Sequence, residues 1–149
     1  MNTRILAIIG AAMMVSAAPV YAESHLAWAA PEGANVYFIG LEDGAVVSSP
    51  VIVRMGLSGM GVAPAMTERE GTGHHHLLID RAPMGEGEED EFMFGLPSDA
   101  HHRHFGGGQT EVSLDLAPGT HTLQLVLGDM NHVPFGPQVV SDVITITVE

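Results

Sequence analysis

The stretch THTLQLVL, Thr120–Leu127, indicates the fold class of the chain. Leucine occupies every second position from 123 to 127, so an extended backbone places these leucines on one face together with His121. A period of two is typical of a β-strand with one buried face, whereas an amphipathic helix has a period of 3.6 residues. A Pro-Gly pair precedes the stretch and a glycine follows it, as expected for turns. We therefore predict a β-strand over 120–127.

Five further segments are short, alternating or β-rich runs bounded by Gly, Pro, Asp or Ser. They span residues 35–39, 51–57, 74–80, 110–116 and 139–148. Six strands without an amphipathic helix predict an all-β domain, and we expect an immunoglobulin-like antiparallel β-sandwich. Residues 81–109 are expected to form a long connection that is functional or mobile, because ordinary loops are shorter.

The first 22 residues, 1–22, have the pattern of a secretory signal peptide. A basic residue precedes an apolar run, and Ala22 supplies the small residue of a cleavage site. A membrane anchor is the alternative, but a spanning helix needs about 20 apolar residues, and this run is shorter and ends at Pro19. We expect a periplasmic or secreted protein without a membrane span after cleavage. Residues 23–34 would be an N-terminal extension and 35–149 a single β-sandwich domain.

The composition excludes several classes of protein. The 149 residues include 18 acidic and 5 basic side chains and no lysine, which gives a formal net charge of −13. Affinity for nucleic acid depends largely on Lys and Arg that neutralise phosphates, so we exclude a nucleic-acid partner. The chain has no cysteine, which rules out disulfides and thiolate metal ligands. It does have 9 histidines, more than a small domain needs for packing.

The spacing of the histidines predicts a metal site. His74 and His76 lie two apart in a predicted strand and share a face, and His102 and His104 repeat this spacing. Together with His132, the two pairs offer the three or four imidazole nitrogens that copper or zinc prefers. Since such ligands must be neutral, we expect metal affinity to weaken as the pH falls through about 6.5 to 5. The alternative is a set of solvated or hydrogen-bonded histidines without a metal.

Antiparallel pairing of the immunoglobulin-like kind brings these clusters to one end of the domain. Pairing of the third predicted strand with the fifth places His74 near the loop that contains His132. The entry to the fourth strand, with His102 and His104, reaches the same end. We expect the clustered imidazoles to be exposed there. His121 falls at the opposite end, and we interpret it as a structural residue at a strand corner.

Four separated motifs carry a resemblance to a known family. They are GTGHHHLLID (71–80), HHRHFGGGQTE (101–111), PGTHTLQL (118–125) and NHVP (131–134). In this order they resemble the exported bacterial family catalogued as domain of unknown function 4399, over residues 34–149. The resemblance implies an exported small β domain with recurring histidines, and it implies no activity.

We expect an exported metal-binding protein that holds or passes copper, and not an enzyme. Copper is the first choice because thioethers favour Cu(I) and six methionines follow residue 22, and zinc is the second choice. One alternative is an immunoglobulin-like envelope interaction module without a metal. Another is a cupin-like metalloenzyme, in which His76 and His121 would share a metal and Asp80 would supply the nearby acid.

Overall fold

The structure is a computed structural model that describes residues 28–86 and 95–149. The expected signal peptide, 1–22, lies outside the described residues. The described part contains β-strands and no helix, so no helix in it is long and apolar enough to cross a membrane. The strands are β1 (Asn35–Phe38), β2 (Val46–Val47), β3 (Val51–Ser58), β4 (Gly61–Val62), β5 (Thr72–Ile79), β6 (His102–His104), β7 (Glu111–Leu114), β8 (Gly119–Gly128) and β9 (Ile144–Val148).

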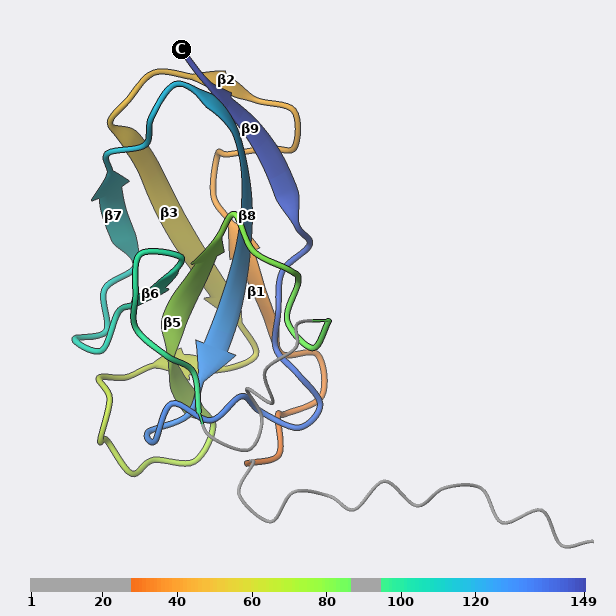
Figure 1. Ribbon diagram of the computed structural model, residues 1–149. Coiled ribbons are helices and arrows are strands. Elements are labelled where there is room, and N and C mark those ends of the chain that lie inside the picture. The colour runs from red at the N-terminus through yellow and green to blue at the C-terminus, as the bar shows by residue number, and fades with distance from the viewer. Residues whose placement is uncertain (1–27, 87–94) are drawn as a thin grey trace, which may run out of the picture.

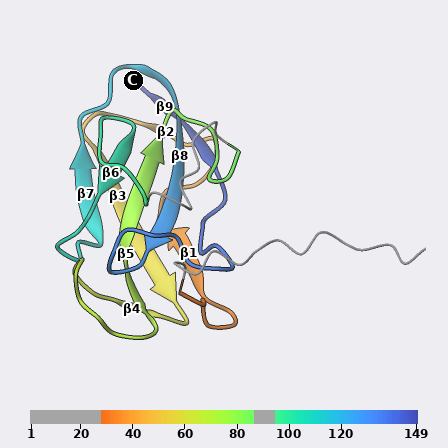
Figure 2. The same cartoon turned by 60° about the horizontal axis from the view of Figure 1, so that its bottom comes forward.

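The strands form two sheets, which Figures 1 and 2 show as two layers. One sheet has three strands in the order β1-β3-β7, all antiparallel. The other has six strands in the order β2-β9-β8-β5-β4, with β6 also paired to β5. Its central pairs are antiparallel, while β2 with β9 and β4 with β5 are parallel. The all-β prediction is confirmed.

The core lies between the sheets and follows the period-two pattern of the sequence. The alternate residues Val51, Val53 and Met55 of β3 are buried, as are the leucines at 123, 125 and 127 of β8. Burial of each such side chain contributes about 1.5–3 kcal/mol. The alternation in THTLQLVL therefore reports the face that packs against the opposite sheet.

Strand β5 is buried on both faces along nearly all of its length, as is β8 from Leu123 onward. Leu77 and Ile79 join the core between the sheets. Leu78 points to the other face, where it packs with Met84, Leu96 and Val126 in a second apolar cluster. A strand that is buried on both faces needs no polar alternation. This explains why the sequence HHHLLID carries no exposed charged residue before its last position.

Two predictions about the positions of strands are wrong. The last strand begins at Ile144 rather than 139. Residues 139–141 still pair with β8 through the Val126–Val140 bridge, but the Ser141 hydroxyl accepts the Leu125 N–H and donates to the Asp142 carbonyl, which interrupts the ladder before Ile144. The connection 81–109 contains a strand, β6, that its sequence did not predict. β6 has three residues, two of them histidine, and its pairing with β5 fixes its place.

Candidate metal centre

Three parts of the chain bring histidines to one place. β5 supplies His74 and His76, β6 supplies His104, and the loop after β8 supplies His132. The strand register accounts for this placement, because His76 lies directly opposite His104 and His74 lies opposite Gly128, the last residue of β8. The predicted meeting of the three segments at one end is confirmed.

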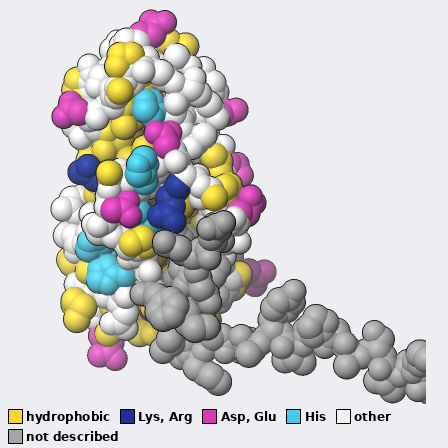
Figure 3. All heavy atoms as spheres, in the orientation of Figure 1, with side chains coloured by type: hydrophobic (Ala, Val, Ile, Leu, Met, Phe, Trp, Pro, Cys, Tyr) yellow, Lys and Arg dark blue, Asp and Glu magenta, His cyan; other side chains and the backbone are white. Residues whose placement is uncertain are grey.

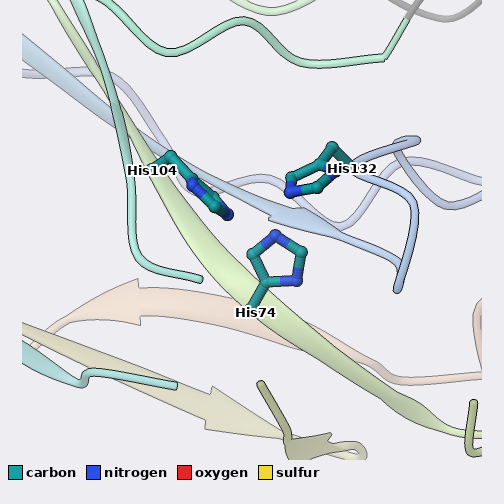
Figure 4. Close-up of side chains that lie close together, drawn as sticks. All are labelled: His74, His104 and His132. Atoms are coloured by element: carbon teal, nitrogen blue, oxygen red, sulfur yellow. The ribbon is translucent and has the colours of Figure 1, made fainter. Parts of the chain in front are cut away.

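The imidazoles of this histidine cluster, defined as His74, His76, His104 and His132, lie within reach of one ion. The Nε2 atoms of His74 and His76 are 3.1 Å apart. One nitrogen each of His74, His104 and His132 lies within 4.8 Å of the other two, and Figure 4 shows these three rings converging. Nitrogen ligands bind at about 2.0–2.1 Å from zinc, so two such ligands are at most about 4.2 Å apart. Small side-chain rotations would bring the nitrogens of His74, His104 and His132 to that spacing, and Nε2 of His76 already lies 3.1 Å from Nε2 of His74.

Two glycines leave room for the rings. A Cβ atom at Gly106 would lie 2.3 Å from Cε1 and 2.6 Å from Nε2 of the His104 ring. A Cβ atom at Gly128 would lie 2.9 Å from Nε2 of His76. Neither glycine has a positive φ, so space and not backbone conformation is the reason for glycine at these positions. The rings of His104 and His76 thus pack directly against the backbone of Gly106 and Gly128.

Burial favours the neutral form of three histidines of the cluster, His74, His76 and His104. Burial, followed by repulsion from His104 and His132, lowers the pKa of His74 to about 4. Burial, followed by repulsion from His74 and His102, lowers the pKa of His76 strongly. Burial and then His132 lower the pKa of His104. Neutral imidazole is the form that binds a metal.

Several ring nitrogens of the cluster are buried without a hydrogen-bond partner among the described residues. They include Nδ1 of His74, Nδ1 of His76 and Nε2 of His104. Buried polar atoms in folded proteins nearly always have a partner, and each exception calls for an explanation such as an ion. Each such nitrogen carries either a proton or a free lone pair, and in the tautomer with a free lone pair it can coordinate a cation.

The structure places His102 beside the cluster and not in it. Its ring neighbours that of His76 at 5.4 Å, and its Nδ1 accepts a hydrogen bond from Arg81 Nη1 at 3.1 Å. Burial and the Arg81 charge lower its pKa to about 4, so the ring is neutral. Because arginine only donates, the proton of this neutral ring is on Nε2. Neither nitrogen then offers a lone pair to a metal.

The expected exposure of the clustered histidines is wrong. His74, His75, His76 and His102 are fully buried, while His104 and His132 are half-buried. Figure 3 shows that histidine side chains reach one face of the molecule at separate places and do not form a continuous patch. β5 is an inner strand of its sheet, with neighbours on both edges, and this explains the burial. An ion would therefore enter from the side of His104 and His132.

His121 lies apart from the cluster, as expected. Its Nδ1 is 2.7 Å from Asp80 Oδ2 and its Nε2 is 2.8 Å from the Ala117 carbonyl oxygen. His76 pairs with Val126, which is about 16 Å along the strand from His121 at 3.3 Å per residue. The pair of ligands that a cupin-like site would need is thus not brought together.

His75 is a buried histidine whose burial the sequence did not indicate. It points away from His74 and His76, and neither ring nitrogen has a partner within hydrogen-bond distance. Burial lowers its pKa and outweighs the nearby backbone of Gln109 and Gly56, which raises it. The residue is a neutral member of the interior.

These features define an all-β domain of two sheets with a cluster of buried and half-buried imidazoles at one end. The chain belongs to the family described as domain of unknown function (DUF4399), whose pattern matches residues 53–149. The match covers every histidine discussed above. Comparison with curated proteins and with solved structures found no match.

Proposed function

We propose that this protein is an exported metal-binding protein that holds or passes copper through His74, His76, His104 and His132. The observation that carries the proposal is the convergence of four imidazoles from three separate parts of the chain. His102 supports the site from outside through its contact with Arg81. The protein carries the ion without turnover.

The ligand chemistry favours copper over zinc. The four ligands are all imidazoles, and the group of three that lies within 4.8 Å contains no carboxylate. For a given set of nitrogen ligands, affinity rises to a maximum at Cu(II) and falls again at zinc. Imidazole also binds Cu(I), so the cluster accommodates both oxidation states. Zinc is the second candidate.

Export and an immunoglobulin-like fold belong to the same proposal. The pattern of residues 1–22 supports secretion to the periplasm or beyond. The strand pairings support the fold, because β3 pairs with β1 and β7 in one sheet while β8 lies between β5 and β9 in the other. Two facing sheets with these antiparallel central pairs support an immunoglobulin-like sandwich.

Metal analysis of the untagged protein, followed by copper and zinc titration, tests the proposal. Wild type should bind one copper ion, and His74→Ala and His104→Ala should each weaken binding by at least about tenfold. His101→Ala is the matched control, because His101 is exposed and its Nδ1 contacts the Ile79 carbonyl instead of the cluster. Equal affinity in all four proteins, or no binding by wild type, would overturn the proposal and favour an interaction module without a metal.

A further inference from the structure

The loop after β8 holds His132 in an uncommon backbone conformation. Its φ is 68°, in the left-handed region that residues with a Cβ atom rarely adopt. Such a residue persists only where its surroundings fix it. The contacts that fix His132 therefore also fix where its imidazole lies.

The buried side chain of Asp129 forms the centre of this loop. Its Oδ1 accepts the N–H of Asn131 at 2.8 Å and the N–H of Val133 at 2.9 Å. Its carbonyl accepts the N–H of His132 at 3.0 Å, and its own N–H donates to the Val133 carbonyl at 2.8 Å. The residues on both sides of His132 are thus tied to one carboxylate.

A neighbouring segment fixes the loop from the other side. The N–H of Leu96 donates to the His132 carbonyl at 2.7 Å. A Cβ atom at Gly95 would lie 3.4 Å from that carbonyl oxygen and 3.5 Å from the carbonyl oxygen of Asn131. Both the N–H and the C=O of His132 are therefore engaged.

We infer that Asp129 is a positioning residue, which builds the turn that places the His132 imidazole against His74 and His104. The centroid of the His132 ring lies 5.0 Å from that of His74 and 4.6 Å from that of His104. The effect of Asp129 on metal binding rests on the proposed function, whereas its effect on the position of the ring does not. Asp129 acts through the backbone, because the two bonds to Oδ1 are made to N–H groups of the loop.

The test compares Asp129→Asn with Asp129→Ala. Asparagine keeps an oxygen at the Oδ1 position, so the His132–His104 ring contact should persist in the metal-free protein, as measured by nuclear Overhauser effects. Copper affinity should then stay within about threefold of wild type. Alanine removes both bonds, so the ring contact should be lost and copper affinity should fall by about ten- to a hundredfold.

Two further variants separate positioning from general stability. Asp43→Ala is the control, because Asp43 Oδ1 also accepts a backbone N–H, that of Thr145 at 2.7 Å, away from the cluster, and it should leave copper affinity unchanged. In a His132→Ala background, Asp129→Ala should cause no further loss of affinity.

A ring contact that survives in Asp129→Ala would overturn the inference. The inference would also be overturned if Asp129→Asn lowered copper affinity as much as Asp129→Ala does, because that result would indicate that the carboxylate is itself a ligand. If wild type binds no copper, the proposed function fails, while the ring contact still decides the role of Asp129.

Discussion

Individual histidines of this protein differ in their affinity for a proton because their surroundings differ. His74 and His76 are buried among other imidazoles, so protonation of one would place a charge in the interior beside its neighbours. His121 has two acceptors, the Asp80 carboxylate and the Ala117 carbonyl, and it donates to both only when both nitrogens carry protons. The first group is suited to bind a metal, and His121 is suited to hold a proton.

The lowered pKa values change the expected pH dependence of metal binding. A ligand whose pKa is about 4 carries no proton above about pH 5, so no proton competes with the metal there. Proton competition at His74 should therefore begin only as the pH approaches 4, so copper affinity should fall less steeply between pH 6.5 and 5 than a set of unperturbed histidine ligands would give. Titration with a competing chelator of known pH dependence measures this slope, and a fall as steep as that of unperturbed histidines would contradict the prediction.

Gly106→Ala should weaken metal binding without removing a ligand. The added Cβ would lie 2.3 Å from the His104 ring, which must move away from the cluster. We expect a loss of about tenfold or more in copper affinity, comparable to other changes that misplace a ligand. Gly107→Ala is the matched control, since its Cβ would meet only the end of the Gln109 side chain. Equal copper affinities of the two variants would contradict the claim that Gly106 leaves room for the His104 ring.

His121→Ala should lower stability and leave copper affinity unchanged. Its hydrogen bonds with Ala117 and Asp80 raise its pKa, so the folded state binds the proton more tightly than the unfolded state does. The resulting stability is fully present below about pH 6.5 and is lost as the pH rises through the raised pKa. The variant should therefore lose about 1 kcal/mol, and more at pH 5.5 than at pH 9. Thermal unfolding at both values checks this, and a larger loss at pH 9 would contradict it.

At the scale of the element, β5 and β6 show what a sequence pattern reveals and what it does not. The pattern HHHLLID predicts an extended strand and places His74 and His76 on one face. Full burial of that face depends on segments distant in sequence, including the Leu96 loop, and no local pattern encodes it. β6 is too short for periodicity, and only its pairing with His76 to Leu78 identifies it as a strand.

Metal binding should stabilise the contact between β5 and β6. An ion held by residues of both strands cross-links them, and a short edge strand otherwise opens easily. The N–H of Phe105, which donates to His75, and the N–H of Ile79, which donates to His101, should exchange more slowly with copper bound. The N–H of Thr122, which donates to Asp80 at the other end, is the control. Equal slowing at all three sites would indicate global stabilisation and contradict the local cross-link.

At the scale of the whole molecule, the two ends of the domain have different roles. Antiparallel pairing of β5 with β8 puts the start of β5 and the loop of His132 at one end, and Asp80 with His121 at the other. The sequence predicted this division because it follows from strand direction alone. It could not predict that His102 contacts Arg81 or that His132 has a left-handed backbone, since both depend on contacts made after folding.

The coordination shell of the loaded ion tests the central claim most directly. X-ray absorption at the copper edge of the copper-loaded wild type should show a first shell of four nitrogens, with the outer-shell scattering that imidazole rings produce. His104→Ala should lower the imidazole count by one, because one nitrogen of His104 lies within 4.8 Å of one nitrogen each of His74 and His132 and is a ligand in the proposed site. A first shell dominated by sulfur, or by oxygen without imidazole scattering, would place the metal outside the histidine cluster and contradict the account.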